Sequence, residues 1–149
     1  MRFALIREEL LRAYGSVRLP AKADMLGAVQ AKLSLQVPEE LRAAYLVMDG
    51  ADESTDPSGS WIRFWPCHEW MSAKDMLPPG SSEEDKSGLY VIADYAINCV
   101  FYVMDMNARS ESFGQIYALG ATRIAHTAKS FSAFVQLVLE DSDDLHTYS

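Results

Sequence analysis

The sequence is poor in the residues that mark secreted, membrane-spanning and nucleic-acid-binding proteins. It has two cysteines in 149 residues, too few for a disulfide framework, so we expect a reducing compartment. Its longest stretch without a charged residue, residues 112–122, is well short of the ~20 apolar residues that span a bilayer. The first six residues resemble the start of a signal peptide, but Arg7, Glu8 and Glu9 interrupt the pattern. We therefore expect a cytoplasmic protein.

Basic side chains are the second shortage, with 13 Lys and Arg against 21 Asp and Glu and a formal net charge of −8. Nucleic-acid binding needs cations that displace counterions from phosphates, and anionic membranes repel an acidic protein, so we expect neither partner. Residues 1–33 carry six basic and three acidic side chains, whereas residues 34–149 carry seven and 18. An acidic body suits a basic protein partner, although acidity also keeps a protein soluble.

Hydrophobic residues are not scarce, at 49% of the chain. A chain of this length buries about two-thirds of its surface on folding, so it can form a core without disulfides or a structural metal. The composition excludes a disordered or fibrous protein. We expect one domain, residues 1–149.

Apolar residues recur at helical spacing in the first third of the chain, which predicts three helices. Their expected ranges are Phe3–Tyr14, Leu19–Leu33 and Pro38–Met48. Proline suits a first helical turn because its missing N–H would be unpaired there, and Asp49-Gly50 supplies a stop.

After Gly50 the pattern changes to short strands with turn-sized separators, which favours antiparallel pairing. The expected strands are residues 61–65, 89–93, 98–104 and 114–119. Residues 71–88 read as a long loop with one helical turn, and Ser130 caps a final helix to Leu139. The sequence therefore predicts an α+β fold, with N-terminal helices, a central antiparallel sheet of about four to six strands and a C-terminal helix packed on it.

Motifs for catalysis or cofactor binding are absent: the sequence has no G-x-S-x-G, P-loop, G-x-G-x-x-G or H-E-x-x-H pattern. Cys67 and His68 are neighbours, and on a strand they would point to opposite faces and share no metal. The acidic stretch from Asp49 to Asp56 lacks the EF-hand spacing and its final glutamate, which favours a solvated turn over a cation site. We expect no cofactor and no metal.

Two carboxylates leave one catalytic alternative open. Asp94 follows one predicted strand and Asp105 closes the next, so a hairpin could bring them together as an acid–base pair. Aspartate also caps strand ends through its own backbone, which is the more common reason for its presence there. A small hydrolase using Asp94 and Asp105 is therefore the third hypothesis for this chain.

Three stretches together resemble the SUKH superfamily, which includes the yeast cell-wall-assembly regulator and many bacterial immunity proteins. Leu35–Gly50 resembles the family's opening helix, which starts at a "LP" dipeptide and ends in Asn/Asp-Gly. Leu89–Asn98 with Tyr102–Asp105 resembles the paired central strands, and Ile124-Ala125 followed by Ser130–Phe134 is similar to the closing helix. The resemblance spans about residues 20 to 140, in the family's order.

This resemblance implies a protein-binding domain without enzymatic activity. Many bacterial members neutralise a toxin, often a nuclease, by binding it directly in the cytoplasm. The leading hypothesis is therefore an immunity protein whose acidic residues occupy a basic toxin site. A general interaction or scaffold module without a toxin is the alternative, and either could be a monomer or a homodimer.

The contact surface is expected to be acidic and partly aromatic. Of the aromatic residues Trp61, Phe64, Trp65 and Trp70, most should be core, with one or two exposed as contacts. The candidate partner-binding residues are Asp52, Glu53, Glu69, Asp94, Tyr95 and Asp105.

Overall fold

The computed structural model describes residues 3–52, 61–76, 87–96, 99–119 and 124–146. It has four α-helices and a six-stranded antiparallel sheet, as the sequence predicts. The helices are α1 (Phe3–Tyr14), α2 (Ala23–Leu33), α3 (Glu39–Tyr45) and α4 (Phe131–Leu139). The strands are β1 (Ile62–Phe64), β2 (Met71–Ser72), β3 (Leu89–Tyr95), β4 (Val100–Asp105), β5 (Ile116–Leu119) and β6 (Ile124–Ala128). Three 3₁₀ turns complete it: η1 (Cys67–Glu69), η2 (Ala73–Asp75) and η3 (Asp143–His146).

The sheet runs in the order β1-β3-β4-β5-β6, and all of its pairs are antiparallel. Strands β1 and β2 pair with different parts of β3, so they lie end to end along the same side of it. The short turns between β3, β4 and β5 account for this order, because antiparallel neighbours need no crossover. The predicted hairpin arrangement is confirmed.

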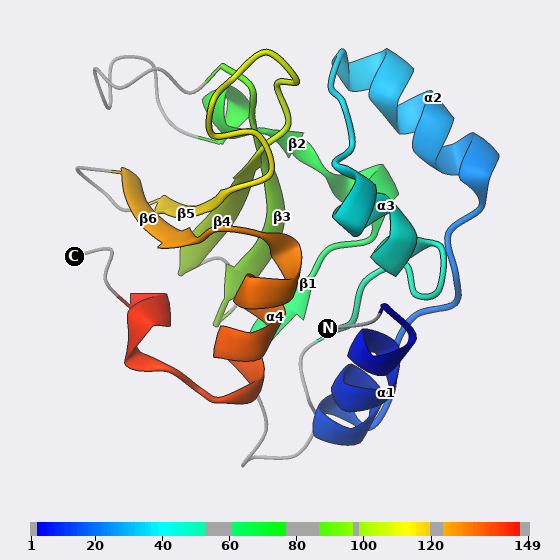
Figure 1. Ribbon diagram of the computed structural model, residues 1–149, viewed down its shortest axis with the longest axis vertical. Helices are drawn as coiled ribbons and strands as arrows, with labels where there is room; N and C mark the ends of the chain where they lie inside the picture. Colours follow the sequence, from blue (N-terminus) through cyan, green and yellow to red (C-terminus); the bar gives the residue numbers. More distant parts are fainter. Residues whose placement is uncertain (1–2, 53–60, 77–86, 97–98, 120–123, 147–149) are drawn as a thin grey trace.

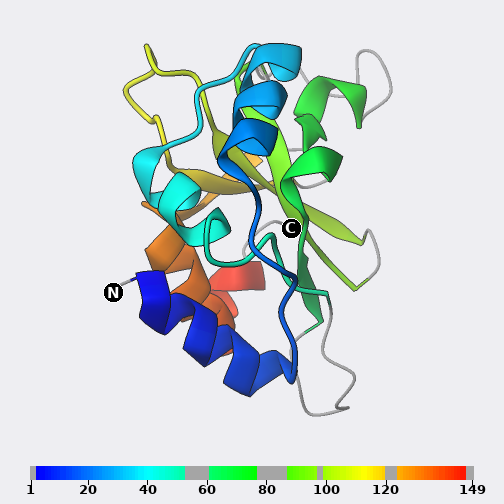
Figure 2. The same ribbon diagram turned by 90° about the vertical axis from the view of Figure 1, so that its right-hand side faces the viewer.

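The four helices pack on one face of the sheet (Figure 1). Aromatic rings carry this contact: Phe64 of β1 meets Tyr14 of α1 and both Phe131 and Phe134 of α4, with ring centroids 5.8–6.1 Å apart. The hydroxyl of Tyr90 on β3 donates to the carbonyl of Leu33 at the end of α2, 2.8 Å away. Figure 2 shows α1 lying beside α4, with α3 above them.

The last helix begins at the predicted cap. The Ser130 hydroxyl accepts a hydrogen bond from the backbone N–H of Ala133 at 3.1 Å, and the Glu40 carboxylate accepts one from Ser132. Two otherwise unpaired N–H groups at the start of α4 are thereby satisfied, one of them by α3. The apolar stripe of α4 is buried as expected.

Four sequence predictions need correction. Helix α2 starts at Ala23 rather than Leu19, because the preceding residues are extended and hydrogen-bond the end of α3: Leu19 accepts from Asp49, and Ala21 donates to Tyr45. Helix α3 ends at Tyr45, three residues before Met48. Residues 71–72 form β2 instead of loop, since they pair with β3. Ile124 and Ala125 belong to β6, which pairs with β5, and so are not part of the closing helix.

We predict that Gly50 tolerates no side chain. Its φ is +86°, and a Cβ there would lie 2.3 Å from the backbone oxygen of Phe64. Gly50→Ala should lower the free energy of unfolding by about 3 kcal/mol, because left-handed strain and a backbone clash add. Gly27→Ala is the matched control, since a Cβ at this position in α2 meets nothing within 4 Å. This variant should raise the free energy of unfolding by ~0.5–1 kcal/mol, because alanine favours a helix more than glycine does. Equal urea midpoints for the two variants would contradict this account.

Candidate functional site

The structure gathers some of the sequence candidates at the β1 edge of the sheet and leaves others elsewhere. Asp52, Glu69 and Asp94 all lie around β1, where Arg63 is the cross-strand partner of Asp94. Tyr95 follows Asp94 on β3, so it points to the opposite face, where its ring contacts His146 at 5.2 Å. Glu53 lies outside the described residues.

Asp105 lies at the far end of the β3–β4 hairpin. It pairs with Leu89, five residues before Asp94 on β3, which corresponds to about 16 Å at ~3.3 Å per residue. An acid–base pair for hydrolysis needs its two carboxylates within about 10 Å. The predicted convergence of Asp94 and Asp105 is therefore wrong, because both close strands of one hairpin at opposite ends.

Arg63 organises the acidic residues at the β1 edge. Its Nε donates to Asp52 Oδ1 and its Nη2 to Glu69 Oε2, both at 3.0 Å. Arg18 lies 3.6 Å from the other Asp52 oxygen, and His68 lies 3.8 Å from Glu69. We call these five residues the Arg63 cluster. The hydrogen bond to Glu69, above all, raises the pKa of Arg63 above its ordinary value, and Asp52 adds to this.

The Arg63 cluster is open to solvent on its acidic side. The side chain of Asp52 is 57% exposed and that of Glu69 is 36% exposed, whereas that of Arg63 is 23% exposed. Exposed ion pairs add little to stability because water screens them. Both carboxylates are therefore accessible from solvent while they bind Arg63. Trp61, the residue before β1, is 58% exposed and supplies a large apolar surface two residues before Arg63 in the chain.

Asp94 lies beneath this edge rather than on the surface. It is 3% exposed, and the indole N–H of Trp65 donates to its Oδ1 at 2.6 Å. Trp65 is itself buried and packs edge-on against Phe101 at 6.2 Å between ring centroids. A buried carboxylate needs such a hydrogen-bond donor, because moving the charged group out of water without one costs several kcal/mol of free energy. The hydrogen bond from Trp65 to Asp94 therefore fixes the Trp65 ring between β1 and β4.

Cys67 and His68 lie in η1, not on the strand that the sequence predicts. The backbone N–H of Cys67, the first residue of η1, donates to the Asp49 carboxylate at 2.8 Å, so the Asp49 side chain caps the start of this turn. The Cys67 side chain is fully buried, and burial above all raises the pKa of its thiol to about 12, with nearby Asp49 adding to the effect. Within the described residues no three His, Cys, Asp or Glu side chains are grouped as a metal site.

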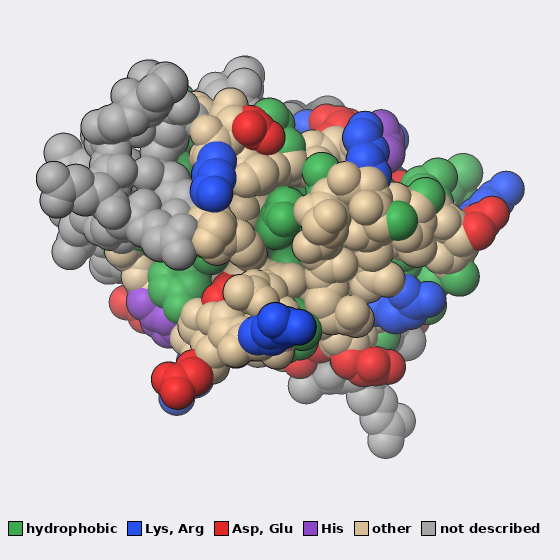
Figure 3. Space-filling view, turned by 90° about the horizontal axis from the view of Figure 1, so that it is seen from above, with side chains coloured by type: hydrophobic (Ala, Val, Ile, Leu, Met, Phe, Trp, Pro, Cys, Tyr) green, Lys and Arg blue, Asp and Glu red, His purple; other side chains and the backbone are tan. Residues whose placement is uncertain are grey.

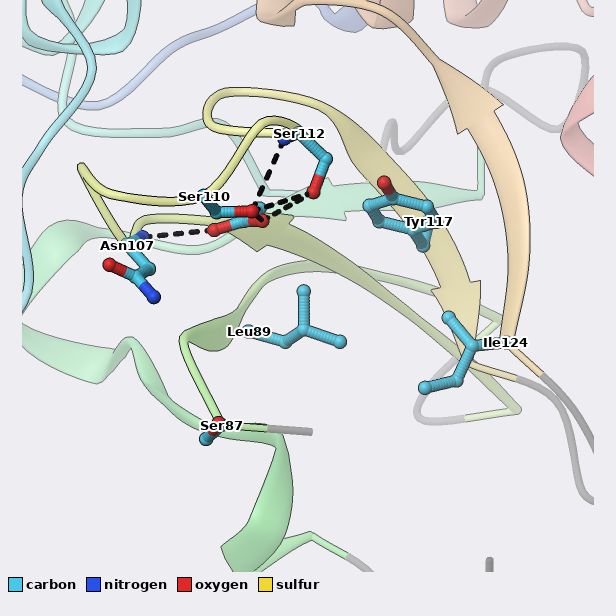
Figure 4. A pocket seen from close by; sticks show the side chains of 8 residues that line it. Ser87, Leu89, Asn107, Ser110, Ser112, Tyr117 and Ile124 are labelled. Atoms are coloured by element: carbon cyan, nitrogen blue, oxygen red, sulfur yellow. Dashed lines mark hydrogen bonds between the residues drawn. The ribbon is translucent and has the colours of Figure 1, made fainter. Parts of the chain in front are cut away.

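A second polar site surrounds Asp105, where a pocket of about 330 Å³ opens beside the β4–β5 turn (Figure 4). The carboxylate lines it and holds the turn: Ser110 and Ser112 donate their hydroxyls to Oδ2 at 2.6 and 2.5 Å, and the Asn107 N–H donates to Oδ1 at 2.9 Å. The other lining residues are Ser87, Leu89, Tyr117 and Ile124. The pocket thus combines one carboxylate and several hydroxyls with an apolar wall.

Charges of both signs are scattered over the face that carries α2 and this turn, as Figure 3 shows. The exposed acids Glu140, Asp141, Asp143 and Asp144 lie elsewhere, between the end of α4 and η3. Among the described residues, acidic side chains therefore lie on several surfaces rather than in one patch.

Sequence reasoning overlooked Arg63, Ser110 and Ser112. Arg63 is the one basic residue in a short aromatic strand, next to acidic turns on both sides; that contrast was the available signal. Asp105 followed by serines five and seven residues later is a pattern that permits a turn of this kind. Neither pattern is specific without the strand register.

The architecture defines the class of this protein: an α+β domain with helices on one face of an antiparallel sheet and a C-terminal helix packed against it. The model of the SMI1 / KNR4 family (SUKH-1) matches residues 20–137, which is most of the chain and includes β1, the hairpin and most of α4. The protein belongs to this family. No curated protein matches the sequence. No helix in the described ranges is long and apolar enough to cross a membrane.

We predict that Trp65→Phe destabilises the fold, because it removes a hydrogen bond to a buried carboxylate. Such a bond to a charged group contributes ~1.5–3 kcal/mol, so the free energy of unfolding should fall by about 2 kcal/mol at pH 7. The exposed Trp61 provides the control, since Trp61→Phe should change it by less than ~0.5 kcal/mol. Urea denaturation of both variants measures the difference, and equal losses would refute the role given to the indole N–H.

We predict that Cys67 is protected from thiol reagents and makes the fold sensitive to alkali. Native protein should show one reactive thiol, the exposed Cys99, and two after unfolding. Because folding raises the Cys67 pKa from 9.0 to about 12, its contribution to stability is complete below pH 9 and is lost as pH rises toward 12.

Cys67→Ala should make the alkaline decline shallower by up to ~1.4 kcal/mol per pH unit, the linkage of one proton. Cys99→Ala should leave the slope as it is. Urea denaturation between pH 8 and 11 measures both slopes, and an unchanged slope in Cys67→Ala would contradict the prediction.

Proposed function

We propose that this protein is an immunity protein, which binds a basic toxin domain in the cytoplasm and blocks it without catalysis. The observation that carries the proposal is the family match over residues 20–137, together with the resemblance of the same stretches to bacterial immunity proteins. A formal net charge of −8 supports a basic partner, since opposite charge accelerates association.

The β1 edge has the chemistry that such contact needs. Trp61 is exposed just before β1, and tryptophan is among the residues that dominate binding energy at interfaces. Two residues further along the chain, Arg63 of β1 holds the carboxylates of Asp52 and Glu69. A basic side chain from the toxin would bind at the carboxylate lone pairs that Arg63 does not occupy, so Arg63 keeps its partners and no charge at the contact is left unpaired.

The mechanism is occlusion. Acidic side chains take the place of nucleic-acid phosphates at the toxin's basic surface, and the domain covers the surface that the substrate would use. Neither step needs a nucleophile or a general base. Asp94 and Asp105 contribute indirectly at most to the surface at β1, because both are buried and hydrogen-bonded within the protein.

The direct test is co-purification of the tagged full-length chain with the product of a neighbouring toxin-like gene. Growth rescue follows, with cells expressing the toxin domain alone or with this protein. We expect a stable complex and rescued growth. If the two proteins neither co-purify nor restore growth, the immunity proposal fails; capture of an unrelated cellular protein by the same surface would favour a scaffold module.

The charge argument has its own matched test. Asp52→Asn with Glu69→Gln removes two negative charges at the β1 edge, and Glu8→Gln with Asp24→Asn removes two from α1 and α2. The first pair should weaken toxin binding about tenfold at low salt, with the loss shrinking at high salt, and the second should change it far less. Equal effects would mean that only net charge matters. Thermal unfolding of both variants checks that folding is preserved.

A further inference from the structure

We propose that the pocket around Asp105 binds the ammonium group of a lysine side chain presented by a protein partner. This inference rests on the proposed function in one respect, namely that the partner is a basic protein. The pocket lies at the opposite end of the hairpin from the Arg63 cluster, so it forms a second contact point.

Among the described residues, the groups that hydrogen-bond the Asp105 carboxylate are all neutral. The residue is 6% exposed, and its carboxylate accepts from the Asn107 N–H and from the hydroxyls of Ser110 and Ser112. These donors stabilise the anion but leave its negative charge in place. Among the ion pairs of the described residues none includes Asp105. A cation that enters the pocket therefore meets a buried anion that forms no ion pair with any described residue, in a place where Coulomb attraction is stronger than in water.

The hydrogen bonds also select the kind of cation. A carboxylate has about four acceptor positions, and Oδ2 already takes two hydroxyls while Oδ1 takes one N–H. A bidentate guanidinium needs both oxygens open side by side, which two serines on Oδ2 prevent. An ammonium needs only one carboxylate position and can complete its bonding with the serine oxygens.

The apolar wall suits the aliphatic stem of lysine. Leu89, Tyr117 and Ile124, from β3, β5 and β6, line the pocket across from the serine-bearing turn (Figure 4). Long basic side chains bury their methylene groups against such surfaces while the charged end finds a polar partner. The ring of Tyr117 adds attraction for a nearby cation.

The nearby turn does not neutralise the pocket. It carries Arg109 and Glu111, one charge of each sign and both exposed. Arg109 lines an adjoining hollow with Tyr90 and Met106, which meets the Asp105 pocket at Ser87 and Asn107, and Arg109 is not among the residues that line the pocket itself. Asp105 thus supplies the excess charge that a lysine would sense.

The test needs no toxin. The ¹⁵N-labelled full-length protein is titrated with N-acetyl-lysine methylamide and monitored by amide chemical shifts. We expect saturable shifts at Asn107, Ser112 and Tyr117. The same compound acetylated on its side-chain nitrogen, which has no charge, should bind about tenfold more weakly, and N-acetyl-arginine methylamide about threefold more weakly. Equal shifts from the neutral analogue, or shifts only elsewhere, would overturn the proposal, and tighter arginine binding would overturn the selection of an ammonium.

Two variants keep the outcome interpretable. Asp105→Asn preserves the shape of the side chain and the acceptor for the Asn107 N–H but removes the charge, so it should abolish the lysine-dependent shifts. Asp75 is an exposed aspartate outside the pocket, and Asp75→Asn should leave these shifts unchanged. If Asp105→Asn fails to fold, Tyr117→Leu tests the wall and should weaken binding about threefold. Unchanged lysine binding in a folded Asp105→Asn protein would refute the site.

The two proposals can fail separately. A toxin complex that forms while the lysine probe does not bind would remove the pocket and keep the immunity function. A probe that binds at Asp105 in a protein without a toxin partner would keep the pocket and remove the immunity function.

Discussion

The fold depends on the packing of Phe64, where the sheet and the helices meet. Its ring is fully buried against Tyr14, Phe131 and Phe134, which belong to the first and last helices. Its backbone exchanges two hydrogen bonds with Ala51. A strand of three residues contributes little by itself, so β1 stays in register because this one side chain is anchored. Since alternate strand residues point to opposite faces, the inward position of Phe64 forces Arg63 and Trp65 outward.

The polar side of β1 follows from that alternation. Arg63 is brought to Asp52 and Glu69, which precede and follow the strand in sequence, and Trp65 is brought to Asp94 on β3. The hydrophobic anchor thus determines where the charges lie. The two carboxylate environments differ as a result. Asp52 is exposed, Glu69 is half-buried and both bind a cation, whereas Asp94 is buried and accepts a hydrogen bond from an indole.

Much of this architecture follows from local sequence signals. The elements that do not follow from them depend on pairing with residues far away in the sequence. Ser130 predicts the start of α4, because its hydroxyl caps a backbone N–H only three residues away. Strands β2 and β6 escape prediction: Met71-Ser72 is too short to show alternation, and residues 124–128 contain a register shift against β5 that breaks it. Their strand state comes from pairing with distant residues, which no local pattern encodes.

The candidate functional residues were likewise predictable from the sequence only in part. Asp52, Glu69, Asp94 and Asp105 could all be selected from the sequence as acidic residues next to turns, but their separation into two sites required the register of the β3–β4 hairpin. With Leu89 opposite Asp105, the two buried aspartates are held at opposite ends of one rigid sheet. That distance rules out their joint action on one small substrate, and the same register separates the Arg63 cluster from the pocket proposed around Asp105. A partner that spans both would gain from each without an added ordering cost, because the sheet fixes their spacing in advance.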